Sequence, residues 1–208
     1  MGEAPQPQRR SQEERKAESE RRIIRAAIEL FATQGYMRTT MNQVGESAGY
    51  TGGLVSHRFG SKEGLLKAVL ERISSRFLED QLRPGIDVDS AAGSLENIIR
   101  IYLDEVTVRE SRIRALYVIM GEALGAVPEV LTGIATLNQG FRDNLVRVIE
   151  RGVEQGEFRS DIDAPASAVF ILGLLRGITM QMLADPAAID SGTMIPLVQA
   201  NALAALKA

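Results

Sequence analysis

The chain has 208 residues, of which 45% are hydrophobic, so it is long enough for one domain or two small ones with a packed core. It contains no cysteine and a single histidine, which excludes disulfides and cysteine nucleophiles and leaves a zinc site without its usual ligands. The formal net charge is −3, but residues 1–62 hold ten Lys and Arg against seven Asp and Glu, so a basic N-terminal part precedes an acidic remainder.

The N-terminal residues predict a disordered arm followed by a helix. Residues 1–18 consist largely of Pro, Gln, Arg, Glu and Ser, with no apolar core of a secretory signal, and we expect them to be disordered. From residue 19, apolar residues recur with helical spacing and Gly35 follows as a C-terminal cap. The residues of this stripe are Ile23, Ala26, Ala27, Leu30 and Phe31.

Two short helices are predicted next. Thr39 or Thr40 can cap the first, which ends at Gly49, and Thr51 can cap the second, which ends at Gly60. Ser61 then caps a longer helix that reaches Phe77. Two short helices joined by a turn that contains glycine form a helix-turn-helix unit.

The rest of the chain predicts longer helices. Apolar stripes cover 95–106, 113–124, 128–149 and about 193–206, and no segment alternates as a half-buried strand does. We therefore expect an all-α fold. No apolar run approaches the ~20 residues that span a bilayer, since the longest, 168–175, ends at Arg176. A soluble, cytoplasmic protein is expected.

Residues 164–183 are apolar nearly all round, and such a helix must be covered on both sides. It is either a fully buried central helix or a helix that packs against a partner subunit. Gly173 and Gly177 have the GxxxG spacing that lets a second backbone come close.

The segment from Thr51 to Lys62 holds the candidate functional residues. A catalytic site is not expected, because His57 has no cysteine to pair with, Ser56 points about 100° away on a helix, and no phosphate-binding loop is present. We expect neither a metal nor a cofactor.

The same residues suit a DNA surface. The hydroxyl and free N–H groups at Thr51 can meet a phosphate, and Gly52 and Gly53 permit close approach of the backbone to a groove. Ser56, His57 and Arg58 are expected to face outward, with Lys62 as a further phosphate contact, while Leu54, Val55 and Phe59 pack inward. Each residue alone also fits a bland interpretation as a loop, a cap or a solvated side chain.

The stretch TTMNQVGESAGYTGGLVSHRFGSKEGLLKAVL, with RRIIRAAIELFATQGY before it, resembles the N-terminal domain of the TetR family of transcriptional regulators over about residues 20–70. The later GVEQGEFRSDIDAPASAVFILGLLRG is similar to the family's approach to its dimerisation helices. The resemblance implies an all-helical homodimer with a three-helix DNA-binding domain at 19–62 and a larger effector-binding and dimerisation domain at 63–208. The residues expected at the DNA are Thr40, Thr51, Gly52, Gly53, Ser56, His57, Arg58 and Lys62.

The chain departs from the family pattern in two places within the predicted recognition helix. Ser56, His57 and Arg58 stand where the family usually has a tyrosine, a variable residue and a histidine, and Gly52 stands where a basic residue is frequent. These departures predict a different operator sequence. Tyr50 replaces an aliphatic residue, and we expect its ring to pack in the core.

The resemblance also implies a repressor released from a palindromic operator when a small, largely apolar effector tilts the fourth helix. The alternative is a ligand-binding or protein-interaction dimer that has lost DNA binding. Candidate effector-pocket residues, which fit a plain core equally well, are Phe77, Ile99, Tyr102, Tyr117, Met120, Leu137, Phe141 and Phe170. Candidate dimer-interface residues are Phe170, Gly173, Leu174, Gly177, Ile178 and Gln181.

Overall fold

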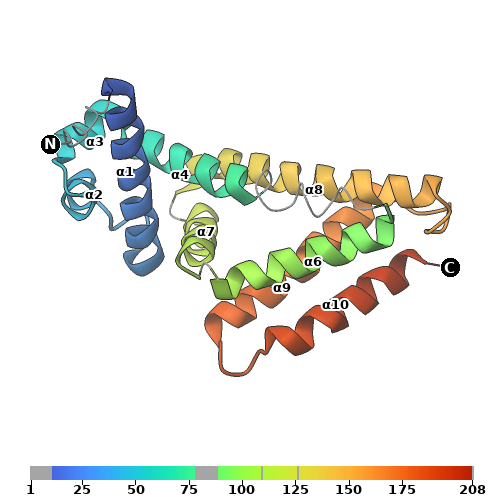
Figure 1. Ribbon diagram of the computed structural model, residues 1–208. Coiled ribbons are helices and arrows are strands. Elements are labelled where there is room, and N and C mark those ends of the chain that lie inside the picture. The colour runs from blue at the N-terminus through green and yellow to red at the C-terminus, as the bar shows by residue number, and fades with distance from the viewer. Residues whose placement is uncertain (1–10, 78–88, 109, 126, 208) are drawn as a thin grey trace, which may run out of the picture.

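The computed structural model describes residues 11–77, 89–108, 110–125 and 127–207, and over these residues the protein is all-helical, as predicted. A small group of three helices at one end is joined by α4 to a larger group at the other (Figure 1). The helices are α1 (Gln12–Gln34), α2 (Met41–Ala48), α3 (Gly52–Phe59), α4 (Lys62–Phe77), α6 (Ala91–Val108), α7 (Glu110–Ala123), α8 (Leu131–Glu154), α9 (Ala164–Ala184) and α10 (Ser191–Leu206).

Helix α1 begins at Gln12, so the predicted disordered arm is wrong for residues 12–18, and residues 1–10 lie outside the described part. A capping box starts the helix: the Glu14 N–H donates to Ser11 Oγ at 3.1 Å and the Ser11 N–H donates to Glu14 Oε2 at 2.8 Å. The polar residues that follow favour helix by intrinsic propensity even though they bury no apolar surface. In the predicted stripe Ile23, Ala26, Ala27 and Phe31 are buried and Leu30 is half-buried, and Gly35 ends the helix with φ 85°.

Helices α2 and α3 interlock through two glycines. A Cβ added to Gly45 would lie 2.6 Å from the carbonyl carbon of Thr51, and one added to Gly52 would lie 1.9 Å from Asn42 Oδ1 and 2.9 Å from Asn42 Cα. Only glycine leaves room for backbones this close. Thr40 caps α2, while the Thr39 hydroxyl donates instead to the Gly35 carbonyl at 2.7 Å.

Helix α4 leads from the N-terminal helices to the side of α8 (Figure 1). The Gly64 N–H donates to Ser61 Oγ at 3.0 Å, which confirms the predicted cap. The buried side of α4 is formed by Leu65, Leu66, Val69, Leu70 and Ile73. The side chain of Phe77 lies outside the described part of the chain.

In the larger group, α6 packs against α8, α9 and α10, while α7 crosses toward α1 and packs against it (Figure 1). The Glu157 carboxylate, which follows α8, accepts the N–H groups of Ala91 and Ala92 at 2.9 Å each and so caps α6. These bonds hold the pKa of Glu157 below its usual value.

Helix α9 is buried on one side only. Val169, Phe170 and Met180 are 57%, 56% and 53% exposed, whereas Ile171 and Leu175 are buried. The hypothesis of a fully buried central helix is therefore wrong within a single chain. Among the described residues α9 alone is long and apolar enough to cross a membrane, with a mean hydropathy of 1.6, but core helices of soluble proteins meet the same criteria.

The Gly45→Ala variant should lower the free energy of unfolding by about 1–3 kcal/mol, because its Cβ meets backbone atoms that cannot move independently. Gly53→Ala is the matched control, since its Cβ would have no neighbour nearer than Thr51 Oγ1 at 3.8 Å. Chemical denaturation measures both. Equal stability of the two variants would contradict the interlock.

Candidate nucleic-acid interface and its link to the C-terminal domain

One face of α3 is open to solvent and the other is packed. Thr51, Gly53, Ser56 and His57 are exposed, and Val55 is fully buried. Thr51 Oγ1 accepts the Leu54 N–H at 3.2 Å and caps the helix. The N–H groups at Gly52 and Gly53 precede the first intrahelical bond, so the start of α3 keeps the donors with which helices bind phosphate.

Two predicted DNA contacts have other roles in the fold. The close approach at Gly52 is to Asn42 of α2, so this glycine is explained by packing and not by a DNA groove. Arg58 is half-buried, and its Nε is enclosed without a hydrogen-bond partner in the described part of the chain. Arg58, which was predicted to face outward, is therefore only partly exposed, because the last turn of α3 packs against neighbouring helices of the N-terminal part.

Lys62 is used within the protein. Its ammonium group donates to the Met37 carbonyl at 2.9 Å and lies 4.4 Å from the centroid of the Tyr36 ring. Burial lowers the pKa of Lys62, and the nearby Glu122 carboxylate partly opposes that shift. Because an ammonium group has three N–H donors, Lys62 can contact a phosphate while it keeps its bond to the Met37 carbonyl.

Glu122, in the last turn of α7, joins the two parts of the protein. Its carboxylate accepts the Tyr36 N–H at 2.9 Å and the Met37 N–H at 3.3 Å, in the turn between α1 and α2. A Cβ at Gly35 would lie 2.5 Å from Glu122 Oε1, so the carboxylate fills space that glycine leaves open. Sequence reasoning missed this contact. Its signal is a carboxylate at a helix C-terminus, where the helix dipole disfavours negative charge.

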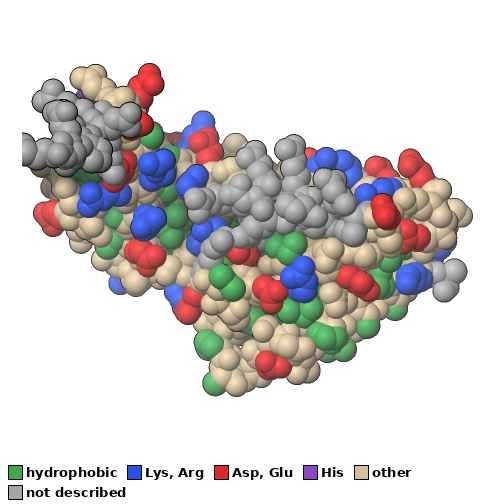
Figure 2. Space-filling view, viewed as in Figure 1, with side chains coloured by type: hydrophobic (Ala, Val, Ile, Leu, Met, Phe, Trp, Pro, Cys, Tyr) green, Lys and Arg blue, Asp and Glu red, His purple; other side chains and the backbone are tan. Residues whose placement is uncertain are grey.

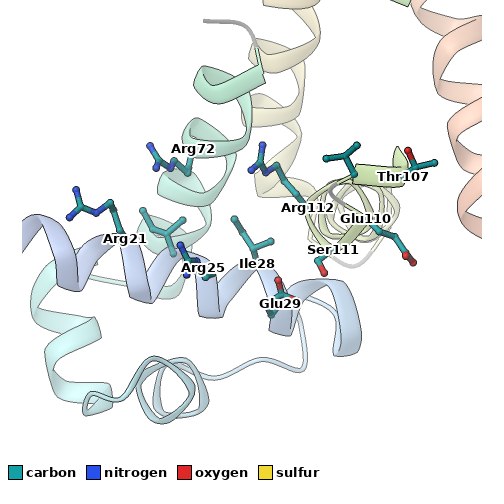
Figure 3. A pocket seen from close by; sticks show the side chains of 11 residues that line it. Arg21, Arg25, Ile28, Glu29, Arg72, Thr107, Glu110, Ser111 and Arg112 are labelled. Atoms are coloured by element: carbon teal, nitrogen blue, oxygen red, sulfur yellow. The ribbon is translucent and has the colours of Figure 1, made fainter. Parts of the chain in front are cut away.

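Basic side chains gather at the junction of the two parts. A cleft of about 510 Å³ lies between α1, α4 and α7, and Figure 3 shows Arg72 and Arg112 extending on the side of α1 from which Ile28 projects. Arg21 and Arg25 of α1 also line it. On the face shown in Figure 2, Lys and Arg side chains gather over the N-terminal helices. Helix α1 carries five Lys and Arg residues but also five Glu residues, so its basic side chains give the helix no net positive charge.

Four of the candidate effector residues meet inside the C-terminal part. The rings of Tyr102 on α6 and Phe141 on α8 pack edge to face, with centroids 5.5 Å apart. Tyr102 and Tyr117 share a hydrogen bond, and the Tyr117 hydroxyl donates to the Arg176 carbonyl at 3.1 Å. Arg176 Nη1 in turn contacts Met120 Sδ at 3.3 Å. Burial raises the pKa of both tyrosines, so they are neutral at physiological pH.

The remaining candidates are dispersed. Ile99 is fully buried on α6, and Leu137 lines a separate groove of about 690 Å³ between α4 and α8. Phe170 is exposed on α9, so its assignment to an interior pocket is wrong.

Ile178 is only 6% exposed, so its assignment to a dimer surface is wrong, because it packs in its own core. The other residues proposed for that surface differ: Phe170, Gly173, Gly177 and Gln181 are exposed and Leu174 is half-buried. Across the described ranges, no group of three or more His, Asp or Glu side chains is placed to hold a metal ion.

Two family models match the chain. The model described as bacterial regulatory proteins, tetR family, matches residues 23–69, and the model described as BetI-type transcriptional repressor, C-terminal, matches residues 91–207. The HTH-type transcriptional repressor KstR2 of Rhodococcus jostii is 28% identical over 161 residues, which cover 72% of each chain.

Solved structures agree in fold. The fatty acid degradation regulator FadR of Bacillus halodurans superposes with a TM-score of 0.81 at 18% identity, over 89% of this chain and 94% of that one. The transcriptional regulator FadR of Bacillus subtilis, in complex with stearoyl-CoA, gives 0.80 at 18% identity, over 88% and 97%.

Replacing Glu122 with Gln should lower the free energy of unfolding by about 1–2 kcal/mol, because the charge-assisted bonds to the Tyr36 and Met37 N–H groups are weakened. Glu150→Gln removes an exposed carboxylate of α8 and should change stability by less than about 0.5 kcal/mol. Denaturant titration compares the two. The link is disproved if both variants are as stable as the parent.

Proposed function

The chain belongs to the TetR family of DNA-binding transcriptional regulators, and from this premise we propose that it is a homodimeric repressor released from a palindromic operator by a small, largely apolar effector. The observation that supports DNA binding most directly is α3, a capped helix whose exposed face carries Gly53, Ser56 and His57 on a rigid two-helix unit. In a dimer, two such helices enter successive major grooves about 34–36 Å apart. Because its target is the chromosome, we expect the protein in the cytoplasm.

The exposed apolar side of α9 supports the dimer. Val169, Phe170 and Met180 are more than half exposed, and Gly173 and Gly177 lie between them along the same face. A Cβ at either glycine would meet nothing within 4 Å, so a second backbone can approach there. A contiguous apolar stripe of this kind marks an interaction surface.

The effector site is proposed among α6, α7, α8 and α9, where Tyr102, Tyr117 and Phe141 meet. Leu137, which lines the groove between α4 and α8, precedes Phe141 of this cluster by one turn of α8. The Bacillus subtilis FadR structure, a complex with stearoyl-CoA, supports a ligand with a long apolar part.

Release follows from a shift of α7. Met120, which the effector would contact, lies two residues before Glu122 on α7. A displacement of α7 would therefore move the Glu122 carboxylate and the loop between α1 and α2 that it holds, and would tilt α4 as well. The effector needs only a different affinity for the two arrangements, typically worth ~1–3 kcal/mol.

The second candidate function is a ligand-binding dimer of the same fold without specific DNA binding. It is favoured by the internal contacts of Lys62 and the partial burial of Arg58. Cationic groups that are engaged within the fold are less available to phosphates, which weakens DNA binding.

Arg58→Ala should weaken specific DNA binding by about 1–3 kcal/mol if the guanidinium reads a base. The assay is fluorescence anisotropy with labelled fragments that flank the protein's own gene, at two salt concentrations and with unrelated DNA as competitor. Arg147→Ala, an exposed arginine of α8, is the control. Saturable DNA binding that persists in the presence of competitor supports the repressor proposal. An unchanged DNA affinity of the Arg58→Ala variant would contradict the assignment of Arg58 to base recognition.

Gly177→Glu should convert the dimer to a monomer, because the carboxylate enters the apolar α9 face but meets nothing within its own chain. Gly121→Glu on α7 is the matched control, since a Cβ there also meets nothing within 4 Å. Sedimentation equilibrium measures the mass of each variant. A dimeric Gly177→Glu protein would place the interface elsewhere.

A further inference from the structure

Arg176 is the one charged residue of α9, and its guanidinium turns inward. The residue lies on the same side as the buried Leu172, Thr179 and Leu183. Its Nη1 contacts Met120 Sδ at 3.3 Å, and thioether sulfur is a weak acceptor. Nε and Nη2 are both enclosed, and neither has a hydrogen-bond partner in the described part of the chain. The apolar helix thus carries a half-buried cation with two enclosed nitrogens that have no partner in the described part of the chain.

The Tyr102 hydroxyl accepts a hydrogen bond from the Arg176 guanidinium, but neither Tyr102 nor Tyr117 supplies a negative charge. The Tyr117 hydroxyl donates its hydrogen bond to the Arg176 carbonyl. Tyr102 and Tyr117 stay uncharged because burial raises their pKa values. A buried guanidinium with unmade hydrogen bonds costs folding free energy, and such groups in native proteins usually have an ion or ligand as partner. The site therefore lacks one negatively charged acceptor.

The two unpartnered nitrogens define the shape of that acceptor. Nε and Nη2 lie on one edge of the guanidinium, where their N–H bonds run parallel and match the two oxygens of a carboxylate. Because the adjoining Tyr102 and Phe141 side chains are aromatic, the rest of the ligand is apolar at this point.

We propose that the effector is an amphipathic carboxylate whose anionic group pairs with the Nε–Nη2 edge of Arg176. This deepens the proposed function and rests on it. The Nη1 atom of the same guanidinium contacts Met120, and Met120 shares the last turns of α7 with Glu122, which holds the DNA-binding helices. Binding of the anion is thereby joined to release of DNA.

The test uses the full-length protein and a series of saturated carboxylates from octanoate to hexadecanoate, each below its micelle concentration. The matched 1-alcohols lack the charge, and the coenzyme A thioesters carry their charge away from the acyl carbon. We expect at least one carboxylate to raise the thermal midpoint at concentrations about tenfold or more below those of its alcohol and its thioester. Equal effects of acid and alcohol would overturn the proposal, and so would a response to the thioester alone.

Arg176→Met keeps an apolar side chain of similar length and removes the guanidinium group. It should lose the carboxylate response by about tenfold or more while its ligand-free thermal midpoint stays the same or rises, since an unpaired buried charge is gone. Arg147→Met, exposed on α8, should respond as the parent does. A lower ligand-free midpoint for Arg176→Met, or an undiminished response, would contradict the assignment.

Thermal shifts are read without DNA, so they separate this proposal from the function on which it rests. If carboxylates stabilise the parent but no fragment binds in the anisotropy assay, the Arg176 site stands and the repressor proposal fails. If operator binding is found and carboxylates neither stabilise the protein nor release the DNA, the Arg176 proposal fails alone.

Discussion

The contact between the Glu122 carboxylate and the turn between α1 and α2 decides how the DNA-binding helices stand relative to the rest of the molecule. Residues 35–37 of this turn are reached from two directions: α7 supplies Glu122 and α4 supplies Lys62. The carboxylate accepts the backbone N–H groups and the ammonium donates to a backbone carbonyl, while the Tyr36 ring adds a side-chain contact to the ammonium. Neither helix can move without changing what the turn touches.

Helix α7 carries both the residues that contact the proposed effector site and the residue that contacts the DNA-binding helices. Tyr117 and Met120 face the C-terminal cluster, and Glu122 faces the N-terminal helices. A helix transmits translation and rotation over two turns with little loss, because its backbone bonds are internal to it. No extended chain of coupled side chains is needed between effector and DNA.

Local patterns predicted the secondary structure well, for reasons that are themselves local. Gly35, Gly49 and Gly60 all end helices, with positive φ, and the stripe from Ile23 to Phe31 is buried apart from Leu30, which is half-buried. The predicted start of α1 lies too far along the chain, because the first turns of the helix are polar and contain no amphipathic spacing. The capping box at Ser11 and Glu14 is the sequence signal that marks the true start.

The site was less predictable, because its defining contacts join residues far apart in the chain. In the sequence, Glu122 is a charged residue beside an apolar stripe and Arg176 is a charged residue within an apolar helix. Their contacts depend on which helix lies opposite, and no local pattern specifies that helix. Gly52 was assigned to DNA because glycine signals close approach without naming the neighbour, and in the structure that neighbour is Asn42. Phe170 was predicted for both the pocket and the dimer surface, and Ile178 for the dimer surface, because a helix that is apolar on all sides gives no clue to its inward face; in the structure Phe170 is exposed and Ile178 is buried.

The interlocked glycines of α2 and α3 also divide the DNA-binding domain into a fixed part and an editable part. Gly45 and Gly52 have no space for a larger side chain. Gly53, Ser56 and His57 lie on the exposed face of α3, where a change of side chain leaves the packing of the domain intact. A library confined to those open positions would vary the chemistry presented to DNA on an unaltered scaffold. This protein is thus a suitable starting point for orthogonal switches in gene circuits, in which many operators must be told apart by one fold.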